Sequence, residues 1–133
     1  MTATSNSNGA SVELLGRLGL AALFLMAGLG KISGYEGTAT YMESAGVPGL
    51  LLPAVIVAEV LGALFLAAGF MTRWTASGLA LFSVLSAVLF HFDFANQMQS
   101  TMFLKNVAIA GGLLILAHHG AGRLSIDHKR ARV

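Results

Sequence analysis

The sequence predicts an all-α membrane protein: a bundle of four transmembrane helices with both termini in the cytoplasm. Three observations lead to this prediction. Hydrophobic residues make up 56% of the chain, charged residues make up only 11%, and the apolar residues form four long segments. Five of the charged residues lie in the last eleven positions, which leaves too few to cover the outer faces of a soluble bundle. The composition therefore argues against a soluble enzyme, and equally against a disordered chain.

Cysteine content and charge restrict the chemistry further. The chain has no cysteine, which excludes disulfides, thiolate metal sites and dithiol relays within it. Its net charge is only +2, and its basic residues are concentrated at one end. This pattern argues against nucleic acid as a partner. The partner that the composition predicts is the lipid bilayer.

The chain divides into two tails and one membrane domain. Residues 1–12, rich in Ser, Thr, Asn and Gly, are expected to form a flexible polar tail. The membrane domain covers 13–122, and a basic cytoplasmic tail covers 123–133. Each predicted span is close to the roughly 20 residues that a helix needs to cross the hydrocarbon core. These spans are 14–31, 51–71, 74–92 and 102–119.

The first span has a second interpretation, because Arg17 followed by an apolar run also occurs in cleavable signal peptides. The residues before Arg17 are polar and acidic rather than basic, and no A-x-A cleavage site follows the run. We therefore favour a permanent span.

The three connections between spans differ in length and character. The first, 33–50, is the longest, and we expect a short surface helix around Tyr41 and Met42. The second is a tight turn around Arg73, and the third, 93–101, is polar.

The basic residues predict the orientation, because an excess of Lys and Arg marks the cytoplasmic side of a membrane protein. With four spans, both termini share one face with the turn at Arg73. The other face has Lys31 and Lys105 as its only cations. We therefore expect both termini in the cytoplasm. The face that they share collects Arg17, Arg73, Arg123, Lys129, Arg130 and Arg132.

Ionisable residues inside the spans are the sharpest functional signal, because an unpaired charge in hydrocarbon is energetically costly. Glu59 lies roughly 12 Å into the second span, at about 1.5 Å per residue. Matching the depths of alternating helices places its candidate partners in the same, outer leaflet. We therefore predict one outward-facing pocket with Asp93 at its rim, formed by Lys31, Glu59, His91, Lys105 and Asn106.

Two interpretations of this pocket stay open. In the first, it binds a polar headgroup or moves a proton, and Glu59 and His91 are the candidate proton-handling groups. In the second, the residues form a buried ion pair that fixes the helix register, while Lys31 and Lys105 extend toward the interface.

The other charged and ligating side chains give weaker signals. We expect Arg17 to extend to the membrane interface and to pair with Glu13, one helical turn earlier. His118 and His119 are adjacent and so point to different sides of their helix, which argues against haem ligation. No His, Asp and Glu triplet has the close spacing of a metal site. We therefore expect no metal and no covalently bound cofactor.

A set of residues with characteristic order and spacing runs through all four spans. The first span has Gly16-Arg17, Phe24, Ala27-Gly28 and Lys31, and the second has Ala58-Glu59, Gly62 and Gly69-Phe70-x-Thr72-Arg73. The third has His91, and the fourth has Lys105-Asn106 and Gly111-Gly112-Leu113-Leu114. From about Leu14 to Gly122, this pattern resembles the DoxX family of small four-helix proteins of the bacterial inner membrane.

The resemblance implies a multi-pass protein of the bacterial inner (plasma) membrane. It also picks out Lys31, Glu59, His91 and Lys105. The family is named for its likeness to a membrane subunit of a quinone-linked thiosulfate-oxidising system. The resemblance therefore implies quinone as a ligand and the proteins of a redox complex as partners.

Three functions are consistent with these features. The leading hypothesis is an accessory or scaffold subunit of a quinone-linked redox complex, with its polar pocket in the outer leaflet. The first alternative is a self-contained oxidoreductase that passes electrons from thiosulfate or another sulfur compound to quinone. It ranks lower because the chain has no cysteine and no flavin or haem motif. The second alternative is a transporter of small solutes or protons, as a homodimer built on the glycine-rich helix faces.

Overall fold

The computed structural model describes the backbone of residues 3–133 and the side chains of residues 7–133. The described chain is helical and contains no strand. Its elements, in order, are α1 (Ala3–Ser33), α2 (Tyr35–Ser44), the short 3₁₀ helix η1 (Gly49–Leu51), α3 (Leu52–Ala68), α4 (Thr72–Phe90), α5 (Gln97–His119) and α6 (Ile126–Ala131).

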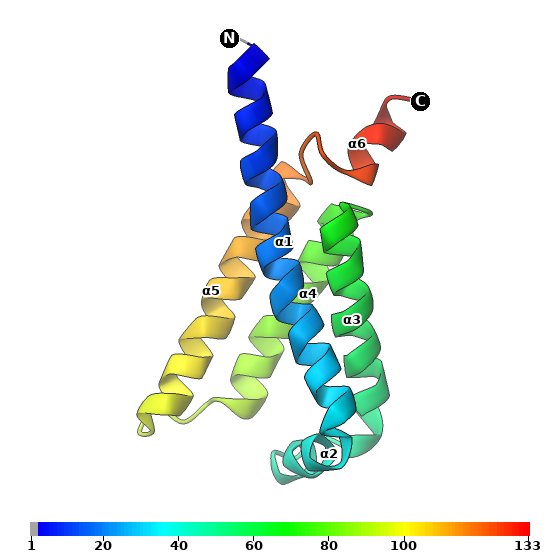
Figure 1. Cartoon of the computed structure of the whole chain (residues 1–133). Coiled ribbons are helices and arrows are strands. Elements are labelled where there is room, and N and C mark those ends of the chain that lie inside the picture. Colours follow the sequence, from blue (N-terminus) through cyan, green and yellow to red (C-terminus); the bar gives the residue numbers. More distant parts are fainter. Residues whose placement is uncertain (1–2) are drawn as a thin grey trace.

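Four of the described segments are long and apolar enough to cross a membrane: Ser7–Ser33, Gly49–Ala68, Thr72–Phe90 and Gln97–His119. The predicted bundle of four transmembrane helices is therefore confirmed. Figure 1 shows that both chain termini lie at the same end of the bundle, here called the terminal end. The opposite end carries α2 and the connection between α4 and α5, and is here called the loop end. The cytoplasmic location of the terminal end stays a prediction.

The spans are arranged as two helix pairs. Helix α1 packs along α3, and α4 packs along α5, whereas contacts between the pairs are much sparser. A turn of three residues joins α3 to α4 at the terminal end. Toward the loop end the two pairs diverge (Figure 1). The geometry therefore separates a closely joined terminal end from a more open loop end.

Small residues allow the helices of a pair to approach closely. A Cβ atom added at Gly28 of α1 would lie 2.6 Å from the Val60 Cγ2 atom of α3 and 3.3 Å from the Glu59 Cβ atom. Only glycine lets the two backbones meet here without displacing α3. The core between the helices has Phe24, Leu66, Leu79 and Leu113 among its buried side chains, together with several alanines.

The structure differs from the prediction at the N-terminal tail. Helix α1 begins at Ala3, so the described part of the segment 1–12 is helical rather than irregular. The hydroxyl of Ser11 donates to the carbonyl of Ser7 at 3.1 Å, one turn earlier. Ala10 is already buried. Because no proline interrupts the polar segment, it continues the first span as one helix.

Several span boundaries also differ from the prediction. Helix α3 ends at Ala68, because Gly69 has a φ of 67° and its left-handed backbone ends the helix. Helix α4 then begins at Thr72 and ends at Phe90. Helix α5 begins at Gln97 because the side chain of Asn96 accepts hydrogen bonds from the backbone of Met98 and Gln99. The short helix predicted in the first connection exists as α2 and begins earlier, at Tyr35.

Candidate functional site

A cavity of about 320 Å³ lies toward the loop end, between the two helix pairs. All of the first five α-helices contribute to its wall. Phe24, Met42 and Ser83 are buried on its inner side. The wall also includes all five residues of the predicted pocket: Lys31, Glu59, His91, Lys105 and Asn106.

Asp93 does not belong to this cavity, although it was predicted at the rim. It lies in the connection between α4 and α5, where its Oδ1 atom accepts a hydrogen bond from the backbone of Ala95 at 3.2 Å. The carboxylate of Asp93 is thus bonded within a local turn. The structure brings five of the six side chains to one cavity, and their role in binding stays a prediction.

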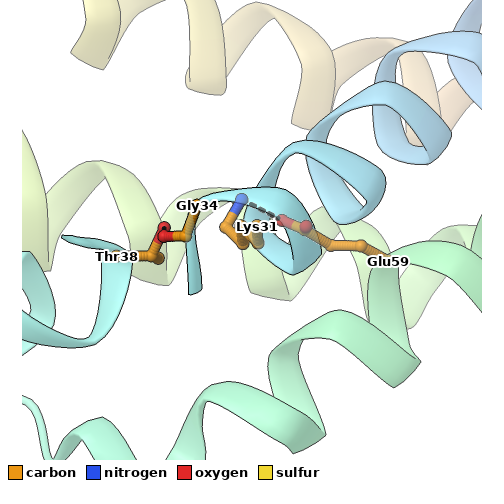
Figure 2. Close-up of polar contacts among 4 residues, drawn as sticks. All are labelled: Lys31, Gly34, Thr38 and Glu59. Carbon is orange, nitrogen blue, oxygen red and sulfur yellow. Dashed lines mark hydrogen bonds and ion pairs between the residues drawn. The ribbon is translucent and has the colours of Figure 1, made fainter. Parts of the chain in front are cut away.

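An ion pair between the helices of the first pair lies in the wall. The Lys31 Nζ atom is 3.0 Å from the Glu59 Oε1 atom, and the two side chains are 28% and 4% exposed, respectively. Figure 2 shows Lys31 extending from α1 toward Glu59 on α3. Lys31 occupies the last turn of α1, where the helix dipole favours a cation. The close approach of the helices at Gly28, one turn earlier, brings the two side chains within reach.

The junction between α1 and α2 flanks this ion pair. The Thr38 hydroxyl donates to the carbonyl of Gly34 at 2.9 Å (Figure 2). Thr38 also lines the cavity. Helix α2 is thereby positioned against the side of the cavity that holds Lys31.

Glu59 is only half satisfied. Its Oε1 atom bonds to Lys31, but its Oε2 atom is buried and has no hydrogen-bond partner among the described residues. A buried acceptor without a donor is costly, because nothing compensates for the loss of its bonds to water. Glu59 lines the cavity, and its carboxyl group keeps one acceptor without a described donor.

His91 and Asn106 present further acceptors. The His91 Nδ1 atom lies 2.7 Å from the Gln99 Oε1 atom. A carboxamide oxygen only accepts, so Nδ1 carries the proton and the Nε2 atom of the neutral ring is left as an acceptor. The Asn106 side chain donates from Nδ2 to the carbonyl of Met102 at 3.2 Å, which leaves its Oδ1 atom free of described partners. Lys105 is exposed and has no hydrogen bond or ion pair with a described residue.

Helix α2 closes the cavity at the loop end. The Tyr41 hydroxyl donates to the carbonyl of Phe90 at 3.3 Å, and the two rings stack with their centroids 5.6 Å apart. Met42, the next residue, is buried against the bundle. The contribution of α2 was not predicted, although the expected surface helix around Tyr41 and Met42 was a signal for it.

We infer that the cavity opens sideways, between α1 and α5. These helices make few contacts with each other, and exposed lining residues lie on both: Leu23 on α1, and Met102 and Lys105 on α5. Both helices are among the segments apolar enough to span a membrane. Such a mouth would face the bilayer. Ser83 and Ser86 on α4 line the cavity as well, and their spacing of three in an apolar span was the signal that sequence reasoning missed.

The position of Arg17 also differs from the prediction. It does not extend to the membrane interface or form an ion pair with Glu13; it is 1% exposed. Its Nη1 atom donates to the carbonyls of Leu66 at 2.8 Å and Ala67 at 3.1 Å, and its Nη2 atom donates to that of Leu124. Only its Nε–H is left without a partner. The carbonyls at the end of α3 lack the partner that a continuing helix would supply, although that of Leu66 also accepts from the backbone N–H of Gly69 at 3.2 Å. They carry partial negative charge, so they hold the cation inside the bundle.

The last segment of the chain docks on the turn between α3 and α4. The two carboxylate oxygens of Asp127 accept hydrogen bonds from the backbone N–H groups of Met71 at 2.8 Å and Thr72 at 2.9 Å. The backbone N–H of Asp127 donates to the carbonyl of Gly69 at 2.9 Å. The segment predicted as a basic tail thus includes a helix, α6, that is bonded to the bundle.

The environment of Asp127 favours its charged form. Burial by itself raises the pKa of this carboxyl group, but the hydrogen bonds from Thr72 and Met71, with the charge of Arg130, outweigh burial. The pKa therefore lies below its ordinary value of 3.8. The carboxylate also suits the N-terminus of α4, where the helix dipole attracts an anion.

Arg73 completes a polar network at the terminal end. Its Nη1 atom donates to the carbonyls of Ala117 at 3.2 Å and His118 at 2.7 Å, at the end of α5. We call Arg17, Arg73 and Asp127, with the backbone groups that they bond, the terminal network. Each of these side chains satisfies groups at a helix end of opposite partial charge.

The histidines near the terminal end form no evident ligand site. The rings of His118 and His119 are exposed, with centroids 5.1 Å apart at an angle of 83°. Across residues 7–133, no three His, Asp or Glu side chains are grouped as a metal ion would require.

Comparison with known proteins gives consistent matches. The family model described as DoxX matches residues 12–92. The chain is similar to the inner membrane protein YqjF of Escherichia coli, with 51% identity over 114 residues, covering 86% of this chain and 88% of the relative. It is also similar to the inner membrane protein YphA of Escherichia coli, with 35% identity over 123 residues, covering 87% of this chain and 88% of that relative. No solved structure matches.

Proposed function

The chain belongs to the DoxX family, and from the polar cavity between its helix pairs we propose that it binds the headgroup of a membrane quinone as an accessory subunit of a redox complex. It is a multi-pass protein of the bacterial inner membrane. The observation that carries the proposal is the buried Glu59 carboxylate. One of its oxygens is held by Lys31, and the other has no partner in the wall of the cavity.

Energetics favour a ligand at this position. A buried ion pair is a weak source of stability, because desolvation offsets its Coulomb attraction. A buried acceptor without a donor adds a further cost. A ligand group that donates to the Oε2 atom of Glu59 removes that cost. The stability that the Lys31–Glu59 pair adds to the fold does not account for its presence, whereas the binding of a ligand would.

The form of the cavity suits a ring with a long apolar tail. Its volume of about 320 Å³ is at the small end of the range for ligand pockets, which fits one substituted ring. The aromatic residues Phe24, Phe82 and Phe90 line it. Its mouth between α1 and α5 would let an isoprenoid tail remain in the bilayer. This combination favours an amphipathic ligand that arrives through the membrane.

An accessory role follows from what the chain offers for electron transfer. The sequence contains no cysteine, and its described residues form no cluster of metal-ligating side chains. We therefore assign electron transfer to a partner subunit. The basic residues of the terminal end support a cytoplasmic position for both termini, and this orientation places the cavity in the outer leaflet.

The test is the amount of quinone that copurifies with the protein. We would purify the full chain from its native membrane in a mild detergent and measure bound quinone by mass spectrometry. We expect near-stoichiometric quinone in the wild type and its loss in Glu59→Gln. Glu36→Gln is the matched control, because Glu36 is an exposed acid on α2 that does not line the cavity. Wild-type protein with no more quinone than bulk lipid carries would overturn the proposal.

A further inference from the structure

We infer that the cavity selects the reduced, hydroxyl-bearing form of its ligand, a hydroquinone, over the oxidised quinone. This inference rests on the proposed function and adds the redox state of the ligand to it. It follows from which hydrogen-bonding groups of the wall are free and from how deeply each of them lies.

The most deeply buried free group of the wall is an acceptor. The Glu59 Oε2 atom is buried without a partner. In its ionised form, paired with the Lys31 ammonium, Glu59 accepts but does not donate at Oε2. The hydrogen bond from His91 to Gln99 leaves the His91 Nε2 atom as a second acceptor. The bond from Asn106 to Met102 leaves the Asn106 Oδ1 atom as a third.

The free donors of the wall are less buried than the Glu59 Oε2 atom, and they include the half-buried hydroxyl of Ser86. Lys31, with two ammonium protons beyond its bond to Glu59, is 28% exposed, and Lys105 is exposed at the mouth. Such groups can bond to water or to lipid phosphates when no ligand is present. The Glu59 Oε2 atom has no such alternative. The preference of the cavity is therefore set by an acceptor that only a ligand can satisfy.

The two redox forms of the ligand differ in whether they can donate a hydrogen bond to this acceptor. A quinone carries two carbonyl oxygens, so that at Glu59 it would place one acceptor against another. A hydroquinone carries two hydroxyl groups, and one of them can donate to the Oε2 atom while the other faces His91 or Asn106. Sites built to bond a ligand hydroxyl strongly reject analogues that lack it, because the buried partner is then left unpaired.

Binding of three matched probes to the purified full chain under anaerobic conditions tests the inference. The probes are a short-chain 1,4-benzoquinone, its hydroquinone, and the 1,4-dimethyl ether of that hydroquinone. The ether keeps the ring but has no hydroxyl donor. We expect the hydroquinone to bind at least about tenfold more tightly than either of the others, because one unpaired buried acceptor changes affinity by about that factor.

The variant Glu59→Gln sharpens the test, because its amide can donate as well as accept. Both probes should bind this variant more weakly than hydroquinone binds the wild type, and the ratio of quinone to hydroquinone dissociation constants should fall toward one. His91→Phe removes a less buried acceptor, and should lower the ratio by a smaller factor if Glu59→Gln does not fold. Equal affinity of the wild type for hydroquinone and quinone, or for hydroquinone and ether, overturns the inference while leaving the proposed function standing. Failure of all three probes to bind overturns both.

Discussion

Arg17 and Glu59 are both buried charges in transmembrane helices, yet they differ in their hydrogen-bond partners. Arg17 lies near the terminal end, where its guanidinium group donates to three backbone carbonyls. Glu59 lies toward the loop end, where one oxygen bonds to Lys31 and the other bonds to no described residue. Burial alone therefore does not identify a functional charge. The difference lies in how much of the charged group the surrounding chain satisfies: at Arg17 only the Nε–H has no described partner, whereas at Glu59 one of the two carboxylate oxygens has none.

The surroundings of the two charges show the same contrast: the chain is packed around Arg17 and leaves a cavity beside Glu59. Around Arg17, the turn between α3 and α4 and the docked α6 segment bring backbone groups together from distant parts of the chain. Around Glu59, the helix pairs diverge and leave a cavity of about 320 Å³. The terminal network stabilises the fold, whereas the incomplete bonding at Glu59 leaves an interaction for a ligand.

Removal of Arg17 is expected to have the largest effect on stability. In Arg17→Leu, the carbonyls of Ala67 and Leu124 lose the donor that Arg17 supplies and that of Leu66 keeps only the Gly69 N–H, so we expect a loss of about 3 kcal/mol in the free energy of unfolding. The unfolding midpoint in detergent should fall by roughly 10 °C. The control is Arg132→Leu, which removes an exposed arginine of the same terminal end. Equal midpoints for the two variants would mean that the buried network contributes no stability.

Protonation of Asp127 is expected to have a smaller effect. Because the folded-state pKa lies below the ordinary 3.8, the carboxylate stabilises the fold above that value, and this contribution is lost as pH falls through the lowered pKa. Asp127→Asn keeps one acceptor oxygen but loses the second acceptor and the charge, so it should cost about 1 kcal/mol at pH 7. The measurement is the unfolding midpoint from pH 7 down to pH 3. The difference between wild type and variant should persist to about pH 4 and shrink as the pH falls below 3.8, and parallel curves would contradict the assignment.

Replacement of the ion pair is expected to have the smallest effect on stability. In Lys31→Met with Glu59→Leu, apolar side chains of similar size replace both charges, so the unfolding midpoint should stay near that of the wild type or rise. Bound quinone should nevertheless be lost. Glu59→Leu alone serves as the comparison, since it leaves Lys31 without its partner. A double variant that fails to fold would instead support the role in helix register.

The sequence was sufficient to predict the four spans and the five polar residues that share the cavity wall, but not the lining residues of α2 or the serines of α4. Span length and apolar composition are local properties, and depth along alternating helices is enough to place Lys31, Glu59 and His91 at one level. The burial of Arg17 could not be predicted in this way. Its partners are backbone carbonyls, which have no signature in the side-chain sequence. One of them belongs to Leu124, 107 residues later in the chain.

The span boundaries and the rim of the cavity show the same limit. Hydropathy extends the second span to Met71, but the left-handed backbone at Gly69 ends the helix at Ala68. Asp93 has the right depth for the pocket, yet a local turn takes its carboxylate away. Apolar composition predicts which segments enter the membrane, while backbone hydrogen bonds determine where each helix ends and which polar side chains remain available.

The docking of α6 has a consequence for biosynthesis. Helices α1 and α3 are complete long before the ribosome reaches Leu124, whose carbonyl bonds to Arg17. The carboxylate that bonds to the start of α4 follows at Asp127. Because a chain folds from its N-terminus as it is made, the terminal network closes only after Leu124 and Asp127 have been added. A chain truncated before Leu124 keeps its spans but leaves Arg17 without its bond to that carbonyl, so we expect it to be less stable and more readily degraded.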